Sequence, residues 1–232
     1  MTQPFTVVFP IYPGVTHLDF TGPQQVLART PGVSVTVASV GGRPVSADGL
    51  TFAELAPLET IERCDVVCVP GGGGVTDAIL DDLFMRHVRR LALEARYITS
   101  VCTGSLVLGA AGLLEGKRAA CHWAWREMLP LFGAIADDGR VVRDGNVITG
   151  GGVTAGIDFA LTLVAELTDD LTAQSVQLAL EYAPQPPFHA GRPETAPAEV
   201  LERVMARNAQ MLPQRRSVAE KMAAEYRRMG PR

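Results

Sequence analysis

Short apolar segments alternate with longer amphipathic ones along most of this chain. The short segments are rich in β-branched residues and predict buried strands over residues 5–9, 33–40, 65–69 and 97–101. Between the last two, residues 76–95 carry apolar side chains at near-helical spacing among charges, which predicts one amphipathic helix. Strands that alternate with helices in this way indicate a parallel sheet covered on both faces.

This alternation changes in the middle and in the second half of the chain. Residues 45–52 and 141–148 each place an Asp-Gly pair between apolar residues, which predicts two hairpins added at the edge of the sheet. Residues 154–167 and 172–182 predict two further helices. Five prolines within residues 183–197 exclude a regular helix there and mark a connection.

The Pro-rich connection separates two predicted parts. Residues 1–183 form an α/β domain, and residues 184–232 form the connection and a terminal helical arm with apolar residues at helical intervals. The chain has 232 residues, of which 47% are hydrophobic, enough for one substantial core. We expect the arm to pack on the body or across a dimer interface.

The net charge of −4 is unevenly distributed, because residues 203–232 carry +6 and residues 1–202 carry −10. A basic tail can bind nucleic acid, but the simpler interpretation is contact with an acidic surface of this chain or of a second subunit. No apolar run approaches the roughly 20 residues that cross a bilayer, and no secretory leader is recognisable. The four cysteines lack the spacing of a disulfide scaffold. We therefore expect a cytoplasmic protein with free thiols and no membrane or nucleic-acid partner.

Cys102 is the strongest candidate for a nucleophile. It follows the predicted strand 97–101 and precedes an apolar helix, so it lies at the carboxyl end of a parallel strand, where α/β sheets bind ligands. The helix N-terminus favours a thiolate, and a sharp turn would expose the side chain, as in a nucleophile elbow. Cys64, Cys68 and Cys121 fit better as small buried hydrophobic residues. We expect no metal site, because no turn folds the first two around an ion.

Four glycines at residues 71–74 follow the strand 65–69 and form a loop whose amides an anion can approach. The loop lacks the Lys and Ser/Thr of a phosphate-binding loop, and no dinucleotide-binding motif follows the first strand. We therefore expect no nucleotide cofactor. Because this loop and the Cys102 turn follow strands that should be neighbours, we interpret the Gly72 and Thr103 amides as an oxyanion hole.

Two side chains could exchange protons with Cys102. Asp19 is either a helix N-cap or, since Thr21 and Pro23 mark a helix start better, a free carboxyl group whose apolar neighbours would raise its pKa. His122 could be the base of a Cys/His pair, or a structural histidine that satisfies a hydrogen bond beside a tryptophan. The residues alone leave these alternatives open.

Together these motifs resemble the ThiJ/PfpI superfamily, relatives of class I glutamine amidotransferase domains, and within it the isocyanide hydratase group. The resemblance covers almost the whole chain, and the segments that carry it are 18–23, 69–72, 99–113, 122–123, 149–159 and 180–184. It implies a flavodoxin-like three-layer α/β sandwich with a mostly parallel sheet, a nucleophile elbow after a central strand and a C-terminal helical arm. It also implies a homodimer.

The resemblance assigns roles to particular residues. The nucleophile falls on Cys102, the acid/base carboxylate on Asp19, a hydroxyl that lines the site on Thr103, and a packing contact to the nucleophile's helix on Ile157. Many members have Glu in place of Asp19, and some have His in place of Thr103, so these differences disfavour protease or glyoxalase chemistry and match the hydratases. The implied substrates are an organic isocyanide and water, which form an N-substituted formamide through a cysteine thioimidate. The implied reaction requires no metal or other cofactor.

Two other functions use the same kind of domain. The sensor halves of AraC-type regulators resemble the motifs around Thr103 and Ala155, but such regulators need about two helix-turn-helix units. The segment from Pro197 onward has 36 residues, which disfavours this function. In a redox sensor Cys102 would be oxidised, and in a glyoxalase- or deglycase-like enzyme it would attack a carbonyl.

Overall fold

A seven-stranded sheet lies at the centre of the computed structural model, which describes residues 4–229 and so excludes the outermost residues of both predicted parts. The strand order is β10-β11-β7-β6-β1-β2-β5, and all neighbours are parallel except β10 and β11. The strands are β1 (Phe5–Pro10), β2 (Val33–Ser39), β5 (Ala56–Pro57), β6 (Val66–Val69), β7 (Tyr97–Val101), β10 (Val141–Asp144) and β11 (Val147–Gly150). The predicted mostly parallel sheet is confirmed.

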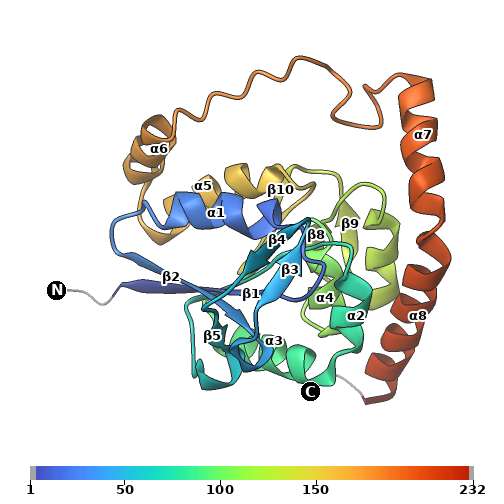
Figure 1. Cartoon of the computed structure of the whole chain (residues 1–232), viewed down its shortest axis with the longest axis horizontal. Coiled ribbons are helices and arrows are strands. Elements are labelled where there is room, and N and C mark those ends of the chain that lie inside the picture. The colour runs from blue at the N-terminus through green and yellow to red at the C-terminus, as the bar shows by residue number, and fades with distance from the viewer. Residues whose placement is uncertain (1–3, 230–232) are drawn as a thin grey trace.

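Helices cover both faces of the sheet (Figure 1). On one face α1 packs on α5, which in turn contacts α6. On the other, α3 and α4 pack on β6, α4 also packs on β7, and α2 contacts both α3 and α4. Their bounds are α1 (Leu18–Leu27), α2 (Val75–Leu80), α3 (Asp82–Glu94), α4 (Gly104–Ala110), α5 (Ala155–Leu167) and α6 (Asp170–Ala179). This arrangement confirms the three-layer sandwich.

The two central strands β6 and β7 are buried at every residue. Strands covered by helices on both faces must carry either apolar side chains or polar side chains that have hydrogen-bond partners. Here Thr99 Oγ1 donates to the Val67 carbonyl oxygen over 2.9 Å. Loops at the ends of these strands are therefore attached to the buried centre of the fold.

The single helix predicted over residues 76–95 is wrong, because the chain forms two helices there. Asp81 separates α2 from α3 with an extended backbone (φ −83°, ψ 100°), and its carboxylate accepts hydrogen bonds from the N–H groups of Leu83 and Phe84. Asp81 thus caps the second helix. Periodicity continues through such a break, so the apolar pattern did not reveal it.

Both predicted hairpins form, but only one lies at the edge of the central sheet. β10 and β11 are that edge, whereas β3 (Val45–Ala47) and β4 (Leu50–Phe52) form a separate two-stranded sheet. The Asp-Gly pattern specifies the turn and not the place where the hairpin packs.

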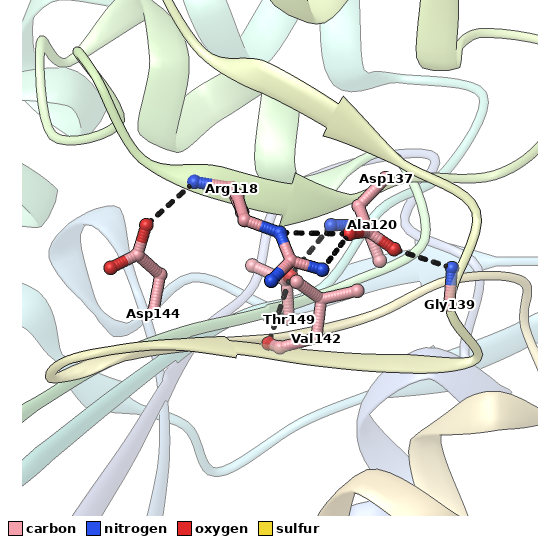
Figure 2. A network of polar contacts seen from close by, with 7 residues as sticks. All are labelled: Arg118, Ala120, Asp137, Gly139, Val142, Asp144 and Thr149. Carbon is pink, nitrogen blue, oxygen red and sulfur yellow. Dashed lines mark hydrogen bonds and ion pairs between the residues drawn. The ribbon is translucent and has the colours of Figure 1, made fainter.

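A small parallel sheet of β8 (Arg118–Ala120) and β9 (Ile135–Asp137) was not predicted, because three-residue strands give too short a pattern. Figure 2 shows how side chains and backbone join it to the edge hairpin. The Ala120 N–H donates to Thr149 Oγ1 over 2.7 Å. This bond holds the last residue of β8 beside β11. The segment that follows β8, starting at Cys121, therefore begins near the carboxyl end of β11.

The Pro-rich connection contains no helix or strand over residues 183–197 and runs across the molecule from α6 to α7 (Figure 1). α7 (Ala198–Ala209) has no buried residue. α8 (Leu212–Met229) packs on α2, α4 and the 3-10 helix η3 (Arg126–Phe132) of the same chain. Within the described residues no helix is long and apolar enough to cross a membrane.

The ion pairs of the basic tail lie inside its own helices. Three pairs are spaced four residues apart on exposed faces, and they are Arg203 with Glu199, Arg216 with Glu220 and Lys221 with Glu225. Apart from Arg203 with Glu199 inside α7, none of the ion pairs found among the described side chains joins the tail to an acidic residue of the body. The contact of the tail with an acidic surface of this chain or of a second subunit stays a prediction.

Candidate active site

Three neighbouring strands, β1, β6 and β7, end at the same edge of the sheet and lead to the candidate residues. The loop after β1 leads to Asp19 in α1, β6 leads to the glycine loop (residues 71–74), and β7 leads directly to Cys102. The strands are in parallel register, so segments far apart in sequence meet at one place. The predicted neighbourhood of the glycine loop and the Cys102 turn is confirmed.

The backbone at Cys102 has the sharp turn expected of a nucleophile elbow. Its φ is 58°, in the left-handed region that costs a non-glycine residue on the order of 1–3 kcal/mol. The Cys102 N–H donates to the Gly150 carbonyl oxygen over 3.0 Å, which fixes the turn to β11. A Cβ at Gly104 would lie 2.0 Å from the Val69 carbonyl oxygen, so only glycine fits where the next helix begins.

The Cys102 side chain is buried, and the prediction that the turn exposes it is wrong: the residue is 5% exposed. Asp19, Cys121 and Arg215, from three different elements, lie close enough to act on the thiol electrostatically. Burial, and then the nearby Asp19, raise the pKa of the Cys102 thiol well above its ordinary value, although the Thr103 N–H opposes this shift. The free protein therefore holds a protonated thiol, whose proton must leave the sulfur before or during nucleophilic attack.

Asp19 lies in the first turn of α1, which begins at Leu18. The expected helix start near Thr21 is wrong, because the Thr21 hydroxyl donates to the His17 carbonyl oxygen within the helix and does not cap it. The Asp19 carboxyl group is fully buried. Its Oδ2 accepts a hydrogen bond from the Gly71 N–H over 2.9 Å, and its Oδ1 has no aligned hydrogen-bond partner among the described residues.

Burial raises the pKa of Asp19 to about 7, against the opposing effects of the Gly71 N–H and the Cys102 thiol. The expected increase in this pKa is confirmed. The Cys102 thiol lies near enough to the carboxyl group to interact with it through hydrogen bonding, which favours the carboxylate. A carboxyl group with this pKa is present in both protonation states near neutral pH, so it can accept and return a proton.

Thr103 connects the glycine loop to the nucleophile's turn. Its hydroxyl accepts a hydrogen bond from the Gly72 N–H over 3.0 Å, and its own N–H acts on the Cys102 thiol. Of the two amides assigned to an oxyanion hole, the Thr103 N–H thus interacts with the Cys102 thiol, and the Gly72 N–H already has a hydrogen-bond acceptor. An anion at the Gly72 amide would have to compete with the Thr103 hydroxyl.

Ile157 contacts the helix that carries Asp19. A Cβ at Gly22 of α1 would lie 3.3 Å from Ile157 Cγ1, and Ile157 and Leu18 line a hollow of about 400 Å³ between α1 and α5. The family resemblance instead implies a packing contact between Ile157 and the helix that follows Cys102. The contacts found for Ile157 are with α1, the helix that carries Asp19.

His122 has the surroundings of a structural histidine. Its ring stacks on Trp123 with 5.6 Å between centroids, and its Nδ1 accepts a hydrogen bond from the Ala124 N–H over 3.3 Å. Burial, and then the charge of Arg215, lower the pKa of His122, so the ring is neutral at neutral pH. No contact with Cys102 is found for it among the described residues, which favours the structural alternative.

Arg215 of α8 is a site residue that the sequence analysis missed. Its guanidinium donates to the carbonyl oxygens of Gly72 over 3.2 Å and Gly73 over 3.3 Å. The guanidinium carbon also lies 4.0 Å from the centroid of the Trp125 ring. Nothing in the sequence distinguishes this arginine from the other basic residues of the tail.

The glycine loop does not form a free anion cradle. The Gly71 amide is bonded to Asp19 and the Gly72 amide to Thr103, while the Tyr12 hydroxyl donates to the carbonyl oxygen of Pro70 over 2.9 Å. In the part of the chain that the structure describes, no group of three or more His, Cys, Asp or Glu side chains could hold a metal ion. The backbone N–H groups of Gly71 and Thr103 thus point to a carboxyl group and a thiol, respectively.

Comparison with known proteins gives matches over most of the chain. A model of the DJ-1/PfpI family matches residues 5–166. The sequence is 52% identical over 220 residues to the isonitrile hydratase of Pseudomonas putida, which covers 94% of this chain and 96% of that protein. The similarity therefore extends through the connection and into the helical arm.

A solved structure and a regulator show two further similarities. A ThiJ/PfpI family protein from Pseudomonas syringae has a TM-score of 0.90 and 41% identity, covering 93% of this chain and 90% of that one. The HTH-type transcriptional regulator CdhR of Pseudomonas aeruginosa is 32% identical over 161 residues, but these are 67% of this chain and 45% of the regulator. The regulator thus contains a large part that has no counterpart here.

Proposed function

The chain belongs to the DJ-1/PfpI family, and on this premise we propose that it is an isocyanide hydratase, an enzyme that adds water to an organic isocyanide and forms an N-substituted formamide. The observation that carries the proposal is the buried Asp19 carboxyl group, which accepts a hydrogen bond from Gly71 and lies beside the Cys102 thiol. The 52% identity to an isonitrile hydratase supports the same reaction.

The first step forms a carbon–sulfur bond. The terminal isocyanide carbon accepts both a nucleophile and a proton, so the Cys102 sulfur attacks it while the thiol proton reaches the same carbon, directly or by way of Asp19. The product is a thioimidate in which carbon carries one hydrogen and is double-bonded to nitrogen. The pKa of about 7 lets Asp19 carry this proton near neutral pH.

The second step uses water and releases the product. The Asp19 carboxylate takes a proton from water, the resulting hydroxide adds to the thioimidate carbon, and Asp19 returns the proton to nitrogen. The carbon–sulfur bond then breaks, the hydroxyl proton returns to sulfur, and the formamide leaves. Atoms and charges balance without an external oxidant or reductant.

Thr103 and Gly72 have supporting roles in this proposal. The Thr103 amide, which already acts on the thiol, stabilises negative charge at the reacting centre, and the Thr103 hydroxyl orients the Gly72 amide. The Gly72 amide joins the oxyanion hole when the hydroxyl turns towards substrate. Ile157 supports the site through its contact with α1.

Steady-state turnover of an aryl isocyanide tests the proposed function. Cys102→Ala should abolish formamide production, whereas Cys64→Ala should retain it, because Cys64 precedes β6 at the opposite end of that strand from the glycine loop. Methylglyoxal assayed with the same enzyme preparation distinguishes the glyoxalase- or deglycase-like alternative. Turnover retained by Cys102→Ala would contradict the mechanism.

We also propose that residues 1–183 form the α/β domain, that residues 184–232 form a connection and arm, and that the protein is a homodimer. Val200, Val204 and Met205 of α7 are exposed although they are apolar, which supports a partner on that helix. Sedimentation velocity should give the mass of two chains, and Val204→Glu should reduce it. A wild-type protein that sediments as one chain at micromolar concentration would contradict the dimer.

A cytoplasmic location is the last part of the proposal. All four cysteines lie in the described part of the chain and are unpaired, as expected in a reducing compartment. Fractionation of cells that express the protein at its natural level would test this location.

A further inference from the structure

Arg215 is a buried cation that α8 brings to the glycine loop from far along the chain. The residue is 7% exposed and lies 143 residues beyond Gly72, whose carbonyl oxygen accepts its hydrogen bond. The Gly73 carbonyl and the Trp125 ring provide its other described contacts. Among the ion pairs of residues 4–229, none includes Arg215.

A buried guanidinium without a carboxylate is costly in the resting protein, and it stabilises any negative charge that arises beside it during function. Two carbonyl oxygens and an indole face compensate only part of the lost hydration. The ionisable groups that act on Arg215 are Cys102, Tyr12 and Cys121, all neutral when protonated. Of these, Cys102 is at the strained turn, beside a carboxyl group able to remove its proton.

We propose that Arg215 is a positioning residue: the helical arm places its guanidinium where the positive charge favours the Cys102 thiolate and where two hydrogen bonds hold the glycine loop in place. This inference rests on the proposed role of Cys102 as nucleophile. Holding the Gly72 and Gly73 carbonyls also orients the neighbouring amides of Gly71 and Gly72, which bond Asp19 and Thr103. The arm is therefore part of the active site and not only a packing element.

The other groups around the thiol do not replace this charge. Asp19 from α1 disfavours the thiolate, and the Tyr12 hydroxyl donates to a carbonyl oxygen. Cys121, after β8, is neutral, because burial raises its pKa to about 12. His122 is neutral as well, and Arg126 of η3 acts on Cys121. Arg215 is the cation for which an electrostatic interaction with Cys102 is found among the described residues.

The test is the pH dependence of Cys102 alkylation by iodoacetamide in the full-length protein, followed by mass spectrometry of the modified peptide. Arg215→Gln keeps a donor for the carbonyls but removes the charge, and Arg215→Lys keeps the charge but donates from a single point. The matched control is Arg216→Gln, because Arg216 is the adjacent residue and its side chain is exposed and paired with Glu220. Isocyanide turnover by each variant is measured in parallel.

Arg215→Gln should alkylate about tenfold more slowly near neutral pH and shift the profile to higher pH, whereas Arg216→Gln should match the wild type. Arg215→Lys should keep the alkylation profile but lose kcat, because the loop is no longer held at two carbonyls. Alkylation does not require isocyanide chemistry, so it tests Arg215 even if the enzyme acts on another substrate.

Alkylation and kcat of the two Arg215 variants also define the outcome that overturns the inference. If Arg215→Gln and Arg215→Lys both fold, as judged by circular dichroism, and both alkylate with the wild-type profile, the inference is wrong. If Arg215→Gln does not fold, the lysine variant decides: unchanged alkylation with reduced kcat supports the inference, and unchanged values of both overturn it.

Discussion

The Gly71 N–H donates to Asp19 Oδ2 over 2.9 Å, although the two residues are 52 positions apart in the chain. This bond fixes one carboxyl oxygen on the glycine loop and leaves Oδ1, which has no aligned partner within the described residues, for proton exchange. Asp19 thus depends on the ends of two neighbouring strands, β1 and β6, for its orientation.

Asp19→Asn should stop the reaction after the first covalent step. The asparagine amide oxygen can still accept the Gly71 N–H, and the thiol proton can still reach the isocyanide carbon, but no base remains to activate water. Turnover should fall at least about a hundredfold. Mass spectrometry should find Cys102 heavier by one substrate molecule, and Asp19→Glu serves as a variant that keeps a base. A fast Asp19→Asn enzyme without an adduct would contradict the role of Asp19 in hydrolysis.

The same substitution should stabilise the fold in alkaline solution. The pKa of Asp19 is about 7 in the folded chain, against an ordinary value of 3.8 for an exposed aspartate, so folding favours the protonated form. Stability is therefore lost as pH rises from about 4 to 7 and changes little above that, with a total on the order of 4 kcal/mol. Asp19→Asn removes this dependence. Its Tm should exceed that of the wild type more at pH about 8 than at pH about 5. Equal differences at both would contradict the raised pKa.

Local and periodic patterns allowed the main sheet and the elbow to be predicted. Parallel strands such as β6 and β7 leave near-continuous apolar runs, and the residues that follow them must meet at one edge. Asp19, the glycine loop and Cys102 could therefore be placed together from the order of the strands. The raised pKa of Asp19 followed from its apolar neighbours.

Features that depend on tertiary contact could not be predicted in the same way. Arg215 resembles any solvated arginine in a basic helix until α8 packs on the body and buries it. The burial of Cys102 has the same origin, because groups from α1, α8 and the chain after β8 surround a turn that by itself would project into solvent. The break at Asp81 depends on a capping carboxylate within an unbroken apolar period.

Gly71→Ala should damage the site through steric contact. A Cβ at Gly71 would lie 2.4 Å from the Thr103 nitrogen and 2.5 Å from Thr103 Oγ1, so either the glycine loop or the nucleophile's turn must move. We expect a loss of about 1–3 kcal/mol in the free energy of unfolding and a much larger fractional loss of turnover. The control is Gly191→Ala, because a Cβ there meets no atom within 4 Å. Urea denaturation and steady-state kinetics of both variants should separate them, and equal behaviour would refute the close approach.

Thr103→Val should show how much the site depends on the hydroxyl between the glycine loop and the turn. Valine has nearly the same shape but leaves the Gly72 N–H without its acceptor, since the Thr103 hydroxyl accepts it at 3.0 Å in a buried position. An unsatisfied buried N–H costs about 1–3 kcal/mol, so the free energy of unfolding should fall by that amount in the free enzyme. Thr103→Ser keeps the oxygen and should retain stability within about 1 kcal/mol, together with most of the activity.

The valine variant also tests whether the Gly72 amide binds developing negative charge, because valine frees that amide for the substrate. In that case the loss of kcat, expressed as an activation free energy, should be smaller than the loss in the free energy of unfolding. Urea denaturation and kcat of the three proteins decide between these roles. A valine variant as stable as the serine variant would show that this hydrogen bond contributes little to the free enzyme.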